Sequence, residues 1–151
     1  MARVVFDASA VIALLRDEAG ADVIAEYAGD ALISAVNLQE VIKALLVRGF
    51  TIDVARAMID ALHLEIRPHT TEDAYAAAEL YEATKEHGRG LGDRTCMALA
   101  IAEGLPALTT DQAWAKLTVP GLTVALARCT STARRTRARR CACRSPCRAF
   151  E

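Results

Sequence analysis

Four acidic residues stand at positions from which a carboxylate could take part in catalysis: Asp7, Glu40, Asp93 and Asp111. Two of them directly follow short apolar runs, and a third begins a strongly apolar stretch. If several of them meet in space, they must be neutralised, because two carboxylates about 4 Å apart repel by roughly 4 kcal/mol at an effective dielectric of about 20. Such a cluster takes up protons or recruits a cation.

The expected cation is a hard one. An all-oxygen set of ligands suits Mg²⁺ or Mn²⁺, whereas zinc calls for imidazole or thiolate. The three histidines, His63, His69 and His87, are not spaced as metal ligands. Mg²⁺ held by carboxylates, with open positions for water, commonly serves to cleave phosphodiesters. The sequence contains no P-loop, and its glycine-rich segment 88–92 is not preceded by a strand as a dinucleotide-binding motif would be.

Each acid also has a purely structural interpretation. Asp7, Asp93 and Asp111 stand where an aspartate commonly caps a helix, and Glu40 could be a solvated helix residue. Glu40 is the hardest to dismiss, because it borders an apolar helix face and a carboxylate beside so much apolar surface favours a partner.

The elements that must position these residues alternate between strands and helices. Short apolar runs predict strands at 4–6, 31–33, 64–66, 107–109 and 122–126. Helical periodicity predicts helices directly after Asp7, over 21–28, from an N-cap at Ser34 to Val47, over 54–62, 71–86 and 95–102, and a short one from Asp111 to Lys116. This alternation predicts an α/β fold, a three-layer α/β/α sandwich with a central, mostly parallel sheet. Ligands bind beyond the carboxyl ends of such strands, where the four acids would converge.

Composition divides the chain into two parts. Residues 1–127 carry 10 Lys and Arg against 18 Asp and Glu and form one domain of ordinary size. The segment carries charges at Arg3 and Asp7 and contains no apolar run long enough to span a membrane, so we expect a cytoplasmic protein without a signal peptide.

Residues 128–151 carry 8 Arg and one acid, with almost no apolar periodicity. This composition is typical of a disordered segment, and its abrupt onset after the last predicted strand suggests a read in a shifted frame. A basic RNA-binding arm and a metal knuckle at Cys141, Cys143 and Cys147 are the alternatives, but the spacing lacks the paired cysteines and histidines of a zinc site.

Four segments in order resemble the PIN-domain nucleases, specifically the VapC-type toxins of bacterial VapBC toxin-antitoxin pairs. They are Val4–Val11, Ser34–Val41, Leu91–Arg94 and the Thr109-Thr110-Asp111-x-x-Trp114 motif. No single motif is specific, but the ordered set is. The resemblance covers about residues 2–127 and leaves the tail without a counterpart.

This resemblance implies a Mg²⁺-dependent endoribonuclease that cleaves transfer or ribosomal RNA, forms a homodimer and is silenced by a VapB-type antitoxin. By position, Asp7 and Asp93 would be the principal metal ligands, and Glu40 and Asp111 would complete the catalytic site. Ser9 and Thr110 would support it through hydrogen bonds, and Arg94 would approach RNA phosphate, neutralise the acids or form a structural ion pair.

Two rivals remain. A haloacid-dehalogenase-like phosphatase also places an Asp after its first strand, but it normally carries a second Asp two residues later, where this chain has Ser9. A catalytically silent PIN-like module that only binds RNA or protein would not need all four acids.

Overall fold

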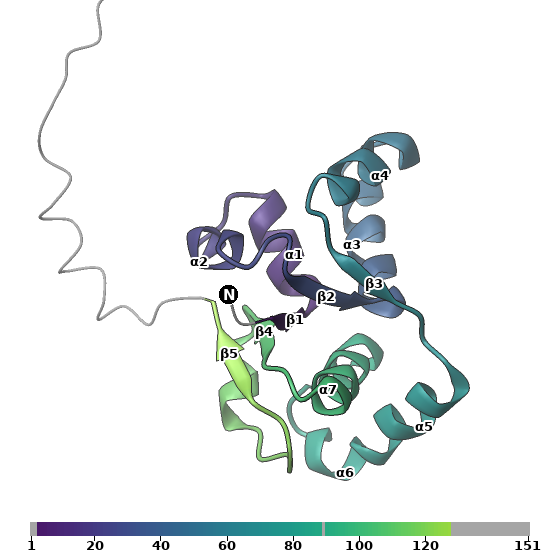
Figure 1. Cartoon of the computed structure of the whole chain (residues 1–151), viewed down its shortest axis with the longest axis vertical. Helices are drawn as coiled ribbons and strands as arrows, with labels where there is room; N and C mark the ends of the chain where they lie inside the picture. Colours follow the sequence, from purple (N-terminus) through teal and green to yellow (C-terminus); the bar gives the residue numbers. More distant parts are fainter. Residues whose placement is uncertain (1–2, 89, 128–151) are drawn as a thin grey trace, which may run out of the picture.

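A five-stranded, entirely parallel sheet forms the centre of the molecule in a computed structural model that describes residues 3–88 and 90–127 (Figure 1). The strand order is β3-β2-β1-β4-β5. The strands are β1 (Val4–Phe6), β2 (Ala31–Ser34), β3 (Glu65–Arg67), β4 (Ala107–Thr109) and β5 (Val124–Leu126). Each strand is short, and β1, β2 and β4 are buried along their whole length, as central strands of a parallel sheet must be, whereas the edge strand β3 carries charged residues and is largely exposed.

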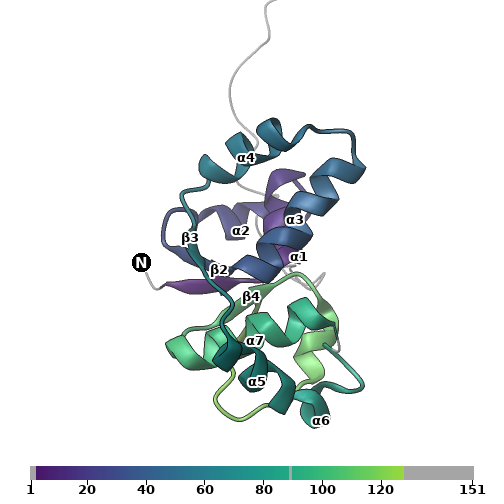
Figure 2. The same ribbon diagram turned by 90° about the vertical axis from the view of Figure 1, so that its right-hand side faces the viewer.

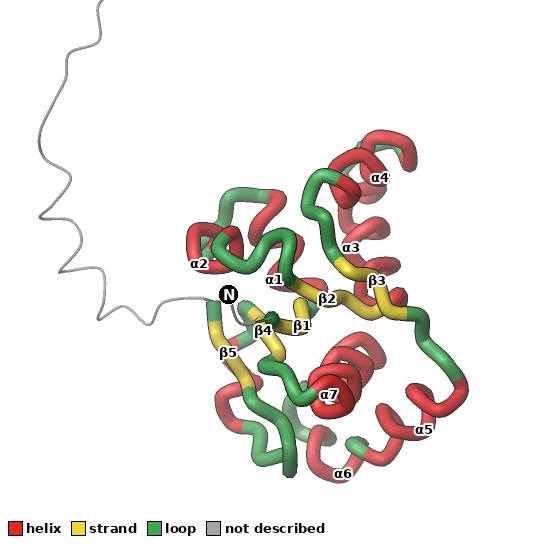
Figure 3. The backbone as a smooth tube through the Cα atoms, in the orientation of Figure 1, coloured by secondary structure: helices red, strands yellow, loops and turns green. Residues whose placement is uncertain are grey.

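Helices cover both faces of the sheet, which confirms the predicted three-layer α/β/α sandwich (Figure 2). One layer holds α1 (Ala8–Leu15), α2 (Ala21–Ala25), α3 (Ala35–Val47) and α4 (Ile52–Asp60). The other holds α5 (Thr71–Glu79), α6 (Tyr81–Thr84), α7 (Leu91–Glu103) and the 3-10 helix η1 (Gln112–Lys116). Figure 3 shows the strands, in yellow, running between these two groups of helices.

The alternation of side chains along the strands creates two separate cores. Val4 and Phe6 face the layer of α1 to α4, whereas Val5 between them faces the layer that contains α7. Met97 and Trp114, both almost fully buried, fill the second core. The apolar pattern of the sequence thus fixes which face of each strand meets which helices.

The structure corrects two predicted helices. The segment 71–86 is not one helix, because it breaks at Leu80, which packs against the second core. The helix predicted over 95–102 begins earlier, at Leu91, so that Asp93 lies inside its first turn. The backbone N–H of Gly90 finds its acceptor in the Asp93 side chain, 2.9 Å away, and this bond allows the extra turn to form.

The central strand β1 has β2 on one side and β4 on the other. The chain therefore changes direction across the sheet at β1, and ligand sites of open α/β sheets lie at such a switch point. Asp7 follows β1 at this place. Among the described residues no helix is long and apolar enough to cross a bilayer. The predicted tail, 128–151, lies outside the described residues.

Candidate active site

Asp7 is fixed at the carboxyl end of β1 by hydrogen bonds to both of its oxygens. Its Oδ2 accepts from the hydroxyls of Ser9, at 2.6 Å, and Thr109, at 3.0 Å. The Ser9 backbone N–H, 3.3 Å from the same oxygen, makes Asp7 the N-cap of α1. Asp7 is only 4 % exposed, so these donors replace water around a buried carboxylate.

Asn37 supplies the donor for the other oxygen of Asp7. Its Nδ2 lies 3.3 Å from Asp7 Oδ1 and 3.2 Å from the carbonyl oxygen of Gly92 at the start of α7. Its Oδ1 accepts from the Ser34 hydroxyl at 2.5 Å, and Ser34 in turn caps α3. One fully buried amide thereby joins β1, α3 and α7.

Glu40 lies one turn after Asn37 on α3 and faces the first turn of α7. A Cβ placed on Gly92 would stand 2.3 Å from Glu40 Oε2, so the carboxylate occupies space that only a glycine leaves open. A short pocket of about 250 Å³ opens here, with Glu40, Lys43 and Gly92 among its lining residues.

Asp93 projects from the first turn of α7. Its Oδ2 accepts the Gly90 N–H, a capping role that the sequence offered as the structural alternative. Asp111 also caps a helix, because its Oδ1 accepts the N–H of Ala113 at 2.9 Å. Arg94 follows Asp93 on α7, and its positive charge acts on the Asp93 carboxylate.

The carboxylates act on one another electrostatically. Partial burial raises the pKa of Glu40, and the charges of Asp7 and Asp93 raise it further. Partial burial likewise raises the pKa of Asp93, the hydrogen bond from Gly90 opposes this, and the charges of Asp7 and Asp111 add to the increase. All four predicted acids therefore belong to one region of negative potential.

Cys96 lies on α7 beneath these acids. Complete burial raises the pKa of its thiol well above the usual range, and the negative charges of Asp7, Asp93 and Glu40 raise it further. The thiol stays protonated at neutral pH, which removes it as a candidate nucleophile.

The carboxylate oxygens of the site are ligands of the kind that a hard divalent cation prefers. Within residues 3–88 and 90–127, no three His, Cys, Asp or Glu side chains are gathered closely enough to hold a metal ion as they stand. Mg²⁺ does not require such a cage, since it keeps several waters and is usually bound through one or two carboxylates together with substrate phosphate. Burial is the main cause of the raised pKa of Glu40 and of Asp93, and repulsion among the acids adds to it; this repulsion favours such an ion.

Comparison with known families decides the classification of the chain. The PIN domain profile matches residues 4–119, which include the whole site. This chain belongs to the PIN domain family. A comparison with curated proteins gave no match.

Solved structures share the fold of this PIN domain. A toxin-antitoxin complex from Klebsiella pneumoniae has a TM-score of 0.63 at 20% identity, over 80% of this chain and 95% of that chain. VapBC2 from Rickettsia felis, bound to a promoter DNA fragment, has a TM-score of 0.63 at 17% identity, over 82% and 98%. VapBC-5 from Mycobacterium tuberculosis has a TM-score of 0.52 at 24% identity, over 83% and 99%.

Two polar contacts to Asp7 in the PIN domain were not predicted. Besides Ser9, a second hydroxyl that donates to Asp7 comes from Thr109, whereas the backbone N–H of the predicted Thr110 donates to Ser9 Oγ at 3.1 Å. The second contact comes from Asn37, which was not predicted to be a site residue. Its position one turn before Glu40, on the same side of a predicted helix, was the available signal.

Proposed function

We propose that this PIN domain is a Mg²⁺-dependent endoribonuclease and the toxin of a VapBC-type toxin-antitoxin pair. The observation that carries the proposal is that Asp7, Glu40 and Asp93, from three different elements, lie close enough at the switch point of the sheet for the charges of Asp7 and Asp93 to act on Glu40. In addition to the effect of burial, the charge of Asp7 raises the pKa of both Glu40 and Asp93, and carboxylates that repel one another in this way suit a site completed by a cation and a phosphate. The motifs shared with VapC-type toxins indicate RNA as the substrate, and transfer or ribosomal RNA as its class.

The side chains of the site would have different roles. Asp7 and Asp93 would hold the cation, with Glu40 and Asp111 completing the negative site. When bound, Mg²⁺ would supply an activated water and offset charge on the scissile phosphate. The donors from Ser9, Thr109 and Asn37 keep the Asp7 carboxylate in one orientation, so that little reorganisation accompanies the reaction.

The partner expected for this protein is a VapB-type antitoxin. The solved structures with the same fold include a toxin-antitoxin complex and VapBC complexes, which supports such a partner here. An antitoxin that covers the carboxylates would block the site directly. We also propose a homodimer that acts in the cytoplasm, where its RNA substrate is found.

Cleavage of total cellular RNA by the purified protein tests the proposal. We expect discrete fragments with Mg²⁺ or Mn²⁺, and their loss with EDTA or with Asp93→Asn. A folded protein that cleaves no RNA under any of these conditions would contradict the nuclease assignment and favour the catalytically silent PIN-like module that only binds RNA or protein.

A further inference from the structure

A pocket of about 250 Å³ opens between α3 and the first turn of α7, directly beside Glu40. We call it the α3–α7 pocket; its lining residues are Val36, Gln39, Glu40, Lys43, Leu91 and Gly92. The α3 residues among them recur at the spacing of one helix face, so a single face of α3 forms one side of the pocket. The start of α7 forms the other side.

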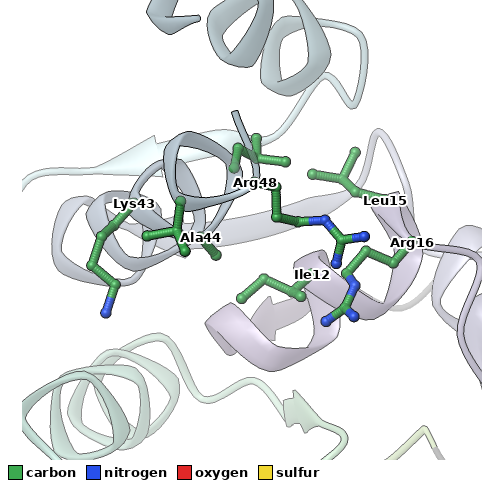
Figure 4. Close-up of a pocket in the computed structure, with 8 residues that line it drawn as sticks. Ile12, Leu15, Arg16, Lys43, Ala44 and Arg48 are labelled. Atoms are coloured by element: carbon green, nitrogen blue, oxygen red, sulfur yellow. The ribbon is translucent and has the colours of Figure 1, made fainter. Parts of the chain in front are cut away.

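The α3–α7 pocket differs in its chemistry from the neighbouring space between α1 and α3. Figure 4 shows the guanidinium groups of Arg16 and Arg48 directed into that space, whereas the side chain of Lys43 extends away from both. The charge of Lys43 acts instead on Glu40, where it opposes the rise in pKa that burial causes. Lys43 and Glu40 therefore form the charged part of the α3–α7 pocket.

The pocket also has apolar walls. Leu91, the first residue of α7, is 69 % exposed beside the acidic site, and the half-buried Val36 adds a second apolar side chain from α3. Gly92 has no side chain to fill the space next to them. Apolar side chains of this kind can pack against the faces of a base that has left its stack.

Two polar side chains, adjacent on α3, can read the edge of such a base. An ionised Glu40 only accepts hydrogen bonds, and Lys43 favours this ionised form. Gln39 is exposed and offers both a donor and an acceptor. Amides commonly recognise adenine, and carboxylates accept from the amino group of cytosine.

Charge and size favour a base over a phosphate in this pocket. Glu40 would repel a phosphate, and Asp7 and Asp93 lie close enough to act on the same region. A neutral ring avoids this repulsion. The volume lies just below the range of about 300–1,000 Å³ that is typical of sites for larger ligands, which suits a single ring system.

We propose that the α3–α7 pocket binds one unstacked base of the RNA, next to the cleaved bond, and that it prefers a base with an exocyclic amino group to uracil. This inference rests on the proposed ribonuclease activity. The amino group would donate to Glu40, Gln39 would bond to the adjoining ring atoms, and Leu91 and Val36 would cover the ring. Uracil carries a carbonyl oxygen where cytosine has its amino group, and that oxygen would face a carboxylate.

Binding measured without cleavage tests the proposal. Fluorescence anisotropy in EDTA compares labelled oligo(C) and oligo(U) of equal length, which carry the same charge and differ in the edge of the base. We expect the full-length protein to bind oligo(C) more tightly by about fivefold or more, the effect of one contact to a base edge. Gln39→Ala and Glu40→Ala should each reduce this ratio.

A substitution in the wall of the pocket separates stacking from edge recognition. Leu91→Ala should weaken the binding of both RNAs several-fold and leave their ratio unchanged, because contact with the ring face does not depend on the edge. Val23→Ala, which shortens an exposed apolar side chain on α2, is the matched control and should change neither affinity. With Mg²⁺, the nucleotide on one fixed side of each cut should be A, C or G, and Gln39→Ala should admit uracil there.

Equal affinity of the wild-type protein for oligo(C) and oligo(U) would overturn the proposal and leave the pocket to a protein partner. A preference for oligo(C) that survives both Gln39→Ala and Glu40→Ala would place the base contact elsewhere and overturn it as well. Because binding is measured without cleavage, a wild-type protein that cleaves no RNA but prefers oligo(C) through Glu40 would refute the nuclease function alone.

Discussion

At the scale of single residues, Asn37 does most to hold the candidate site together. Its amide, which is fully buried, forms hydrogen bonds with Asp7, the Gly92 carbonyl and the Ser34 hydroxyl at once. A buried network of this kind is stable only when every member has its partner, because each unsatisfied polar group costs about 1–3 kcal/mol.

We therefore expect Asn37→Ala to lower the free energy of unfolding by about 1–3 kcal/mol. Urea denaturation of the two proteins measures the difference. Gln39→Ala, an exposed neighbour on the same helix, serves as the control and should change stability by no more than about 0.5 kcal/mol. Equal stability of Asn37→Ala and the wild type would show that the buried bonds contribute nothing net.

The raised pKa of Asp93 leads to a second prediction for a single residue, which concerns how stability depends on pH. The folded protein keeps the proton on this carboxyl to a higher pH than the unfolded chain, where its pKa is about 3.9. Its contribution to stability therefore falls as the pH rises from about 4 through the folded pKa, and stays low at neutral pH.

Asp93→Asn should accordingly raise the free energy of unfolding at pH 7 in EDTA, by about 1 kcal/mol, a size typical of substitutions at functional sites. Asparagine keeps an oxygen for the Gly90 N–H, so the cap is retained. Repeating urea denaturation at pH 4 should show the gain shrinking. A gain that is equal at both pH values would exclude repulsion as its cause.

The residues of the site were only partly predictable from the sequence. Asp7 and Asp93 stand out because apolar segments flank them. Asn37 and Thr109 do not, because their importance comes from reaching a residue 30 or 102 positions away, and no local pattern encodes that distance.

At the scale of elements, the first turn of α7 packs closely against α3. Gly92 presents no side chain to Glu40, and an added Cβ would fall within 2.9 Å of both carboxylate oxygens. The obstructing atoms are the end of a flexible side chain, so a larger residue would displace the carboxylate and leave the helices in place.

Gly92→Ala is thus expected to fold with near wild-type thermal stability and to lose at least tenfold in RNA cleavage, a barrier increase of about 1.4 kcal/mol. The control is the same substitution in a Glu40→Ala background, where the alanine has nothing to displace. A further tenfold loss in that background would mean that Gly92 acts by some route other than Glu40.

Elements were more predictable than residues. Strand and helix positions followed from apolar runs and periodicity, and parallel pairing from their alternation. The order of the strands in the sheet did not follow from the sequence, because no local pattern shows that β1 pairs with both β2 and β4, which lie far from it along the chain. The break in the predicted helix 71–86 at Leu80 was not predicted, because it depends on which helix face packs against the second core.

At the scale of the whole molecule, charge is unevenly distributed along the chain. Residues 1–127 hold 18 of the 19 acids, and residues 128–151 hold 8 of the 18 basic residues. Within residues 3–88 and 90–127, the last backbone hydrogen bond to the sheet is donated by the Ala127 N–H to the Thr109 carbonyl at 2.9 Å.

Truncation after Arg128 should therefore leave the melting temperature unchanged, as followed by differential scanning fluorimetry. RNA binding should weaken and lose much of its dependence on salt, because the arginines of the removed segment contribute nonspecific phosphate contacts. A lower melting temperature would show instead that the segment contributes to folding or to dimer formation.

The hydrogen bond from Thr109 to Asp7 joins residues 102 positions apart, and it closes the site around the first strand of the chain. Pairings so distant in sequence form late and slowly. A chain still being synthesised has Asp7, which we propose to be catalytic, long before it has β4, the strand that orients it. We therefore expect the nascent protein to be harmless on the ribosome, and to become a nuclease only when nearly all of it has emerged.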